Sequence, residues 1–539
     1  MQRIAIIGSG PTAIYTLQGL ADASQPLHIT IFEASEISGT GAPYRVGETD
    51  HMLLANIASI EIPPICSSYA DWLRALPAEI LTLFGVATDQ IDERAFLPRV
   101  LLGAYFRDQL RRLAEQAETN GHRVEIFPET RVVDVAMTVD GCNLSAMRGG
   151  SLFSAVADRV VLATGHQWSA KDAPEQQRFA SPWPSSKLSA IAPGRVGVIG
   201  TSLSGIDAAV AVAASCGAFS DTGEGSIVYE PNKDAGDLHI ALMSRKGVLP
   251  EADFWCPLPY EPLQVCTPDA LANVAAGPVE GRLQSVFELI VQEIVRADPE
   301  YAGRIGLDQL DVEGFHDAYF AGRLNTDPFD YAAANLDEVR SNAAVRHTCG
   351  WRYAILRMHE MIESVVADLT PEDQTRFAET LKEIFIDNYA AVPPQSIARL
   401  LALHRAGCLD VVALGDDYTC DIEAPDMGAV MTYHGGQLTF DAFIDARGQK
   451  ALVLDDLPFP TLRRQLRATP EDGKRAVEFD DDLSVSGAKG QLYCAAIPFL
   501  MHRLPFVQGI TACHWLGARV SGALVSGLEV TSNPTPAAA

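Results

Sequence analysis

The chain has 539 residues, 47% of them hydrophobic and 20% charged, which is ordinary for a globular protein and excludes a disordered or collagen-like one. Sixty-nine Asp and Glu residues against 41 Lys and Arg give a formal net charge of -28. A surface this acidic repels phosphate backbones, and nucleic acid is therefore not an expected partner. The net charge is still compatible with a local basic pocket that binds one small anion. At about 150 residues a domain, the length predicts roughly three to four domains, or fewer large ones.

The ten cysteines are scattered and include no CxxC pair, so no zinc ribbon, other metal site or thioredoxin-type site is expected. Scattered thiols are typical of a reducing cytosol. Residues 4–20 are apolar, but Gly and Pro interrupt them and no basic leader precedes them, and no other window offers about 18 uninterrupted apolar residues. We therefore expect a cytoplasmic protein without a membrane span.

Short strands and helices alternate over the first part of the chain, which predicts an α/β layer structure. Strands are expected at 4–7, 27–32 and 159–162, and helices at 11–21 and 97–117. Pro and Gly then interrupt the chain, and a second strand, turn and helix begin at residue 195, with a further strand at 238–243.

Residues 268–405 have a different character, because long amphipathic helices such as 283–296 and 376–388 dominate them. From residue 409 the chain returns to strands. The pattern predicts an α/β fold with two Rossmann-like dinucleotide-binding domains and a helical insertion.

The first predicted strand runs into Gly8-Ser-Gly10-Pro11-Thr-Ala13, a GxGxxA pattern directly before a helix. Gly8 permits a tight turn, Gly10 lets a pyrophosphate approach the backbone, and Ala13 lets the helix lie close to the strand. Pro11 suits the first turn of a helix whose free N–H groups favour negative charge. Glu33 ends the next strand, where a carboxylate binds adenosine ribose hydroxyls and favours FAD or NAD over NADP. The alternative is a tight turn that serves packing only.

The second unit reads Gly200-Thr-Ser202-Leu-Ser204-Gly205 and departs from GxGxxG, because Ser202 replaces the middle glycine. Serine is small, and its hydroxyl can contact phosphate. Two residues separate Ser202 from Gly205, so the segment is not a GxSxG nucleophile elbow. These four positions are candidate contacts for a second dinucleotide.

The strand after this second unit ends at Arg245 and Lys246. Basic groups at this position suit a ribose 2′-phosphate, whereas an acidic residue would repel it. They therefore favour NADP over NAD, unless they form only a solvated turn.

Two nucleotide units with Ala163-Thr164-Gly165 between them resemble the two-dinucleotide-binding-domain flavoproteins. More narrowly, the chain is similar to FAD/NAD(P)-binding proteins related to flavin-dependent N-hydroxylases and other class B flavin monooxygenases. The similar segments are 8–13 with Glu33, 53–58, 96–100 leading into Tyr105, 163–168, 200–205, 244–247 and 444–448. The resemblance is closest over about the first 250 residues and specifies cofactors better than substrate.

The resemblance implies FAD at the first unit and NADPH at the second. Thr164 and Gly165 would lie at the domain crossover, and Arg99 would pair with a phosphate or, alternatively, with a surface acid. The segment 506–511, which includes Gly509, would precede a helical run from residue 512 onward whose N-terminus stabilises negative charge on reduced flavin, unless Gly509 is an ordinary turn before a packing helix. The implied division starts with the first part of the FAD domain at 1–190 and the first part of the NAD(P) domain at 191–267. The helical insertion follows at 268–405. Residues 406–530 return to both domains and include the flavin-closing segment, and 531–539 form a flexible tail.

The implied reaction is hydride transfer from NADPH to FAD, followed by oxygenation of a small nucleophile, such as an amine, through a flavin hydroperoxide formed with molecular oxygen. Asn56 is the candidate side chain beside that adduct, and His166 is a candidate for proton handling. For both, a structural hydrogen bond is the alternative. Two other functions stay open: a flavin dehydrogenase or oxidase without oxygen insertion, and a nucleotide-binding redox sensor. A homo-oligomer is compatible with the sequence.

Overall fold

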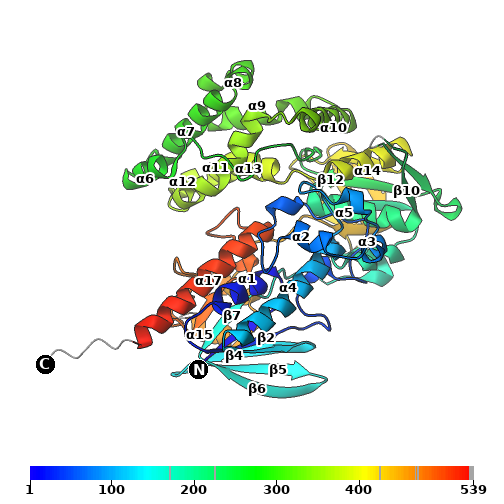
Figure 1. The fold of residues 1–539 in the computed structure, drawn as a ribbon. Coiled ribbons are helices and arrows are strands. Elements are labelled where there is room, and N and C mark those ends of the chain that lie inside the picture. The colour runs from blue at the N-terminus through cyan, green and yellow to red at the C-terminus, as the bar shows by residue number, and fades with distance from the viewer. Residues whose placement is uncertain (169–170, 224–225, 424–425, 468, 470–472, 533–539) are drawn as a thin grey trace.

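The computed structural model describes residues 1–168, 171–223, 226–423, 426–467, 469 and 473–532. It contains two α/β domains and a helical domain, which lies along one side of both in Figure 1. Residues 531–532, which we expected in a flexible tail, continue the last helix, and 533–539 lie outside the described residues.

The first domain is built on a parallel sheet with the strand order β18-β7-β1-β2-β3. Its buried strands are rich in Ile and Val, which pack well on a pleated surface covered on both faces. The strands are β1 (Gln2–Ile7), β2 (Leu27–Phe32), β3 (Arg123–Phe127), β7 (Arg159–Leu162) and β18 (Leu492–Cys494). An antiparallel sheet of β4 (Thr130–Met137), β5 (Cys142–Arg148) and β6 (Ser151–Ala157) lies beside it, at the bottom of Figure 1.

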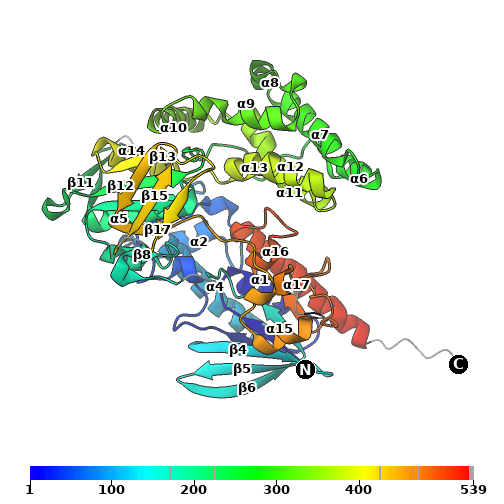
Figure 2. The same cartoon turned by 180° about the vertical axis from the view of Figure 1, so that it is seen from behind.

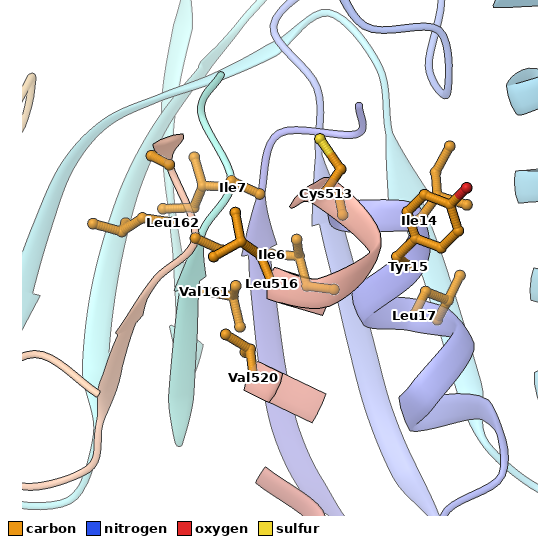
Figure 3. Close-up of a cluster of buried hydrophobic side chains, with 14 of the residues drawn as sticks. Ile6, Ile7, Ile14, Tyr15, Leu17, Val161, Leu162, Cys513, Leu516 and Val520 are labelled. Carbon is orange, nitrogen blue, oxygen red and sulfur yellow. The ribbon is translucent and has the colours of Figure 1, made fainter. Parts of the chain in front are cut away.

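Helices from both ends of the chain cover this sheet. The C-terminal helix α17 (Gly509–Ser532) packs against α1 (Pro11–Ala21), and Figure 3 shows its Leu516 and Val520 near Ile6 and Val161. The two backbones approach closely, because a Cβ at Gly517 would lie 2.6 Å from the Tyr15 carbonyl carbon. The remaining helices here are α2 (Tyr69–Arg74), α3 (Ala78–Leu83), α4 (Arg99–Thr119), α15 (Pro460–Leu466) and α16 (Ile497–Leu500).

The second domain has a parallel sheet with the order β13-β12-β9-β17-β8, visible in Figure 2. Helix α5 (Leu203–Cys216) follows β9, and α14 (Pro394–Arg405) packs beside α5. The polar stretch after α5 forms the hairpin β10 (Gly217–Asp221) and β11 (Ile227–Pro231). The other strands are β8 (Arg178–Phe179), β9 (Arg195–Ile199), β12 (His239–Ser244), β13 (Leu409–Ala413), β14 (Thr419–Asp421), β15 (Ala429–Tyr433), β16 (Gly436–Phe440) and β17 (Ala442–Asp445).

The helical domain corrects one expectation, because the helix predicted over 376–388 is broken at Thr380. Thr380 has φ -127° and ψ -91°, and its hydroxyl donates to the carbonyl of Arg376, which competes with helix propagation. The helices are α6 (Pro268–Ala276), α7 (Arg282–Ala297), α8 (Pro299–Ile305), α9 (Val312–Leu324), α10 (Pro328–Val345), α11 (Gly350–Val366), α12 (Pro371–Glu379) and α13 (Leu381–Tyr389). Among the described residues, no helix has the length and apolar character needed to cross a membrane.

Candidate functional site

The turn after β1 forms a cradle at the carboxyl end of the first sheet. Gly8 has φ +108°, and a Cβ there would lie 2.1 Å from the Ala163 carbonyl oxygen, so only glycine fits. Gly10 differs, because it has φ -72° and a Cβ there would meet only the Cα of Gly41, at 3.5 Å. It is the N-cap of α1 and has no side chain to cap the helix, Pro11 follows it in the first turn, and the positive end of the helix dipole is favourable for an anion.

Side chains beside the cradle fit a dinucleotide. The hydroxyls of Ser38 and Thr40 are buried and have no hydrogen-bond partner among the described residues. Both belong to the segment that ends at Gly41, whose Cα faces Gly10. Ala13 is fully buried, so α1 lies close to the sheet, as the pattern requires. Unpaired buried hydroxyls next to a helix N-terminus suit the diphosphate of FAD.

Glu33 lies at the end of β2, but protein donors surround its carboxylate. Its Oε2 accepts a 2.6 Å hydrogen bond from the Ser9 hydroxyl. Its Oε1 accepts from the backbone N–H and hydroxyl of Ser35, at 2.8 and 2.7 Å, and pairs with Arg45 at 3.3 Å. A carboxylate offers about four acceptor sites, so a ribose hydroxyl would have to replace one of the serine hydroxyls.

The N-terminus of α17 lies beside this cradle. The Cys513 thiol hydrogen-bonds to Thr12 in the first turn of α1, and burial raises the pKa of Cys513 to about 11, so it stays neutral. Gly509, the first residue of α17, has φ +79° and is exposed. The helix N-terminus predicted to close the flavin site therefore adjoins the α1 N-terminus.

The crossover after β7 links the two domains. The Thr164 hydroxyl accepts a 3.0 Å hydrogen bond from the Gln167 amide, and the Gln167 N–H donates to Gln449 at 2.9 Å. Gly165 has φ +69°, which suits this sharp bend. His166 is exposed and lines a shallow cavity of about 300 Å³ with Trp168, Trp183, Lys187 and their neighbours.

Asn56 lies in the loop between β2 and α2 and is half-buried. Its side-chain amide has no hydrogen-bond partner among the described residues, so the alternative of a structural hydrogen bond finds no partner there. The amide is free to bind a ligand.

The second cradle repeats the geometry of the first. Gly200 has φ +120°, and a Cβ there would lie 2.6 Å from the Ala446 carbonyl oxygen. A Cβ at Gly205 would lie 2.1 Å from the Gly200 oxygen, so glycine permits close packing of α5 on β9. Ser202 is the exposed N-cap of α5, and its hydroxyl caps no backbone N–H. Ser204, in the first turn, is half-buried.

Arg245 and Lys246 follow β12, as predicted, but they already hold a carboxylate from the helical domain. Glu383 of α13 accepts from Arg245 at 2.7 Å and from Lys246, and His316 of α9 lies 3.0 Å from the Lys246 ammonium. Burial opposes the charge of Glu383, but Lys246, His316 and Arg245 outweigh it and lower its pKa below the ordinary value. A ribose 2′-phosphate would compete with this carboxylate.

Arg99 pairs with a protein acid, but this acid is buried and belongs to the other α/β domain, whereas we expected a surface acid as the alternative to a phosphate. Its Nη2 lies 2.7 Å from Asp207 of α5, and its Nε donates to the Leu54 carbonyl at 2.8 Å. Its guanidinium also lies 5.0 Å from the centre of the Trp183 ring. Arg99 and Asp207 are both buried, so the pair joins the two α/β domains. No sequence pattern pairs these positions.

Phe506 begins the segment that leads into α17, and its contact with the helical domain was not predicted from the sequence. It packs in the core of the helical domain against the rings of His359, Phe385 and Tyr389. Its backbone N–H donates to Glu363 of α11 at 3.1 Å. The segment that leads into α17 is thus anchored in the helical domain, three residues before Gly509.

Glu363 gives this anchor a testable pH dependence. Burial raises the pKa of Glu363 to about 7, so the folded chain holds a proton that the unfolded chain releases above about pH 4.5. This contribution to stability is complete below that pH and is lost as pH rises through 7. The melting temperature of Glu363→Gln should therefore fall less than that of the wild type between pH 5 and 8. Glu372→Gln, an exposed control, should follow the wild type; parallel curves for all three would contradict the assignment.

The fold and the two cradles are those of the two-dinucleotide-binding-domain class of proteins. A family model described as FAD-NAD(P)-binding matches residues 5–167, and one described as YdhS-like middle domain matches residues 267–389. The chain is 44% identical to the uncharacterized protein YdhS of Escherichia coli over 529 residues, 97% of this chain and 98% of that protein. The chain belongs to the YdhS family.

Solved structures confirm the predicted fold class. The ornithine hydroxylase PvdA of Pseudomonas aeruginosa matches with a TM-score of 0.53 at 13% identity, over 98% of this chain and 99% of that one. The ornithine N-hydroxylase KtzI of Kutzneria matches with a TM-score of 0.52, with the same identity and coverage. At this identity the likeness establishes the fold alone. No cluster of three or more His, Cys, Asp or Glu residues able to hold a metal ion occurs in the part of the chain that the structure describes.

Proposed function

We propose that this protein is an FAD-dependent monooxygenase that takes electrons from NADPH and uses molecular oxygen to oxidise a small-molecule nucleophile of the amine class. The observation that carries the proposal is the pair of glycine cradles, each at the carboxyl end of a parallel sheet. The first has the hydroxyls of Ser38 and Thr40, unpartnered among the described residues, beside it, and the second has the Ser202 hydroxyl, which caps no N–H of α5. Bound FAD would supply the redox chemistry. The proposed reaction class, hydroxylation of an amine, is taken from the ornithine hydroxylases that share the fold.

The residues of the chain divide this work. Gly10 and the first turn of α1 would hold the diphosphate, and the α17 N-terminus would favour negative charge on the reduced cofactor. The free Asn56 amide would bind a polar group at the reacting centre. His166 is exposed, so its proposed proton handling would operate at the mouth of the site.

The preference for NADPH rests on Arg245, whose side chain remains 59% exposed although it pairs with Glu383. Arg245→Ala should weaken NADPH binding about tenfold or more, because a charge-assisted contact to phosphate is worth about 1.5–3 kcal/mol, and should change NADH binding less than about twofold. Glu383→Gln removes the competing charge and should strengthen NADPH binding. Titrations of the FAD-loaded protein with both nucleotides measure this. If Arg245→Ala weakened the binding of NADPH and NADH equally, the assignment of Arg245 to the 2′-phosphate would be wrong.

The activity test is substrate-stimulated NADPH oxidation in ¹⁸O₂. Labelled oxygen in an amine substrate supports the proposal. Label found only in peroxide or water would identify an oxidase, and reduction of other acceptors without oxygen use would identify a dehydrogenase. Tight nucleotide binding without turnover would identify a redox sensor. Failure to bind FAD at all would remove the whole class.

A further inference from the structure

A cavity of about 530 Å³ lies between the two α/β domains, away from both glycine cradles in sequence. The first domain contributes residues 51–54 and 82–98, and the second contributes Gln395 and Arg399 of α14. Its wall is mixed: Leu54, Phe84 and Val86 form an apolar part, and His51, Thr82, Gln90 and Gln395 are polar. A cavity of this size is within the range that holds small organic molecules.

One buried cation, Arg399, lines this cavity. Arg399 is 6% exposed, and its only hydrogen bond to the described residues goes from Nη1 to the Met52 carbonyl. Its Nε is buried without a partner there. A guanidinium has five N–H donors, so most of its donors remain available.

The surrounding acids do not satisfy this charge. Asp50 and Asp207 act on Arg399 electrostatically, but among the described residues neither accepts a hydrogen bond from it, and Asp207 is held by Arg99. Burial outweighs both acids and lowers the pKa of Arg399 to about 10, still far above neutrality. The charged form therefore persists in a site where an unpaired cation is unfavourable.

We propose that this cavity binds a small monocarboxylate with an apolar body, with the carboxylate on Arg399 and the body against Leu54, Phe84 and Val86. A carboxylate matches the planar donors of a guanidinium. A single negative charge fits better than a phosphate dianion, because Asp50 and Asp207 would repel the second charge.

The test measures binding of octanoate and of its neutral counterpart 1-octanol to the full chain by calorimetry, without NADPH, so that it does not depend on the proposed function. Octanoate should bind at least tenfold more tightly than octanol. Arg399→Met should lose at least tenfold in octanoate affinity and leave octanol binding unchanged. Arg405→Met, one and a half turns further along the same helix and exposed, should behave as the wild type.

A second variant guards against misfolding of the Arg399 variant. Thr82 is exposed at the cavity wall, so Thr82→Trp should fold normally and block both ligands. Failure of octanoate to bind the wild type, equal affinities for octanoate and octanol, or unchanged octanoate binding in Thr82→Trp would each overturn the proposal.

Discussion

Replacing Gly10 by valine should abolish FAD binding while the chain keeps its fold. The backbone of Gly10 has φ -72°, which any residue adopts, and its Cβ would make only an ordinary contact with Gly41. The valine side chain would instead fill the space that a diphosphate needs above the α1 N-terminus. We expect at least a hundredfold loss of FAD affinity, about 2.7 kcal/mol, measured by flavin absorbance at about 450 nm after reconstitution.

Two other glycines make this result specific. Gly236→Ala is the control, because Gly236 has φ -61° and a Cβ there meets nothing within 4 Å, so flavin content should not change. Gly8→Ala should instead lose the fold together with the flavin, because its Cβ collides with Ala163. A Gly10→Val protein that retains one FAD per chain would show that the first cradle does not hold the diphosphate.

Asp207→Ala should lower the free energy of unfolding by about 3–5 kcal/mol. The substitution leaves the Arg99 guanidinium, which is only 8% exposed, buried without its carboxylate. Urea unfolding, with both proteins saturated with the same cofactors, measures the difference. The double variant Arg99→Met/Asp207→Leu should recover most of the loss, because replacing a buried ion pair by apolar side chains is often neutral.

An exposed pair on the same helix α4 provides the control. Arg111 and Glu115 lie 2.7 Å apart but are both well exposed, so Glu115→Ala should change stability by less than about 1 kcal/mol. If Asp207→Ala were no more destabilising than Glu115→Ala, the Arg99–Asp207 pair would not hold the two domains together.

Local patterns predicted much of the fold, because each cradle is made of residues adjacent in sequence. A strand that ends in Gly8 or Gly200 and continues into a helix needs no distant information: the positive φ of both glycines is a property of the turn itself. The helical insertion was also predictable from its periodicity. The break at Thr380 was not, because the helical pattern continues through it and only the hydroxyl contact with Arg376 marks it.

The candidate site was less predictable wherever a side chain had a distant partner. Glu33 is surrounded by Ser9, Ser35 and Arg45, and Arg245 is held by Glu383, 138 positions away. In each case the residue type was suited to a nucleotide, but a protein group of matching chemistry lies there as well. The type of a residue and its place in a motif indicate which ligands its side chain can bind. The tertiary fold determines whether another protein group already occupies that side chain.

The order of segments in the first sheet has a consequence for synthesis of the protein. Strand β18, at residues 492–494, pairs with β7 at the sheet edge, and α17 covers α1 only from residue 509 onward. Domains generally fold in order from the N-terminus as they emerge from the ribosome. The first domain of this chain cannot complete its sheet until nearly the whole polypeptide has been translated. Until then the edge of β7 is unpaired and can pair with another strand. A premature stop codon late in the gene would therefore ruin the domain encoded at its beginning.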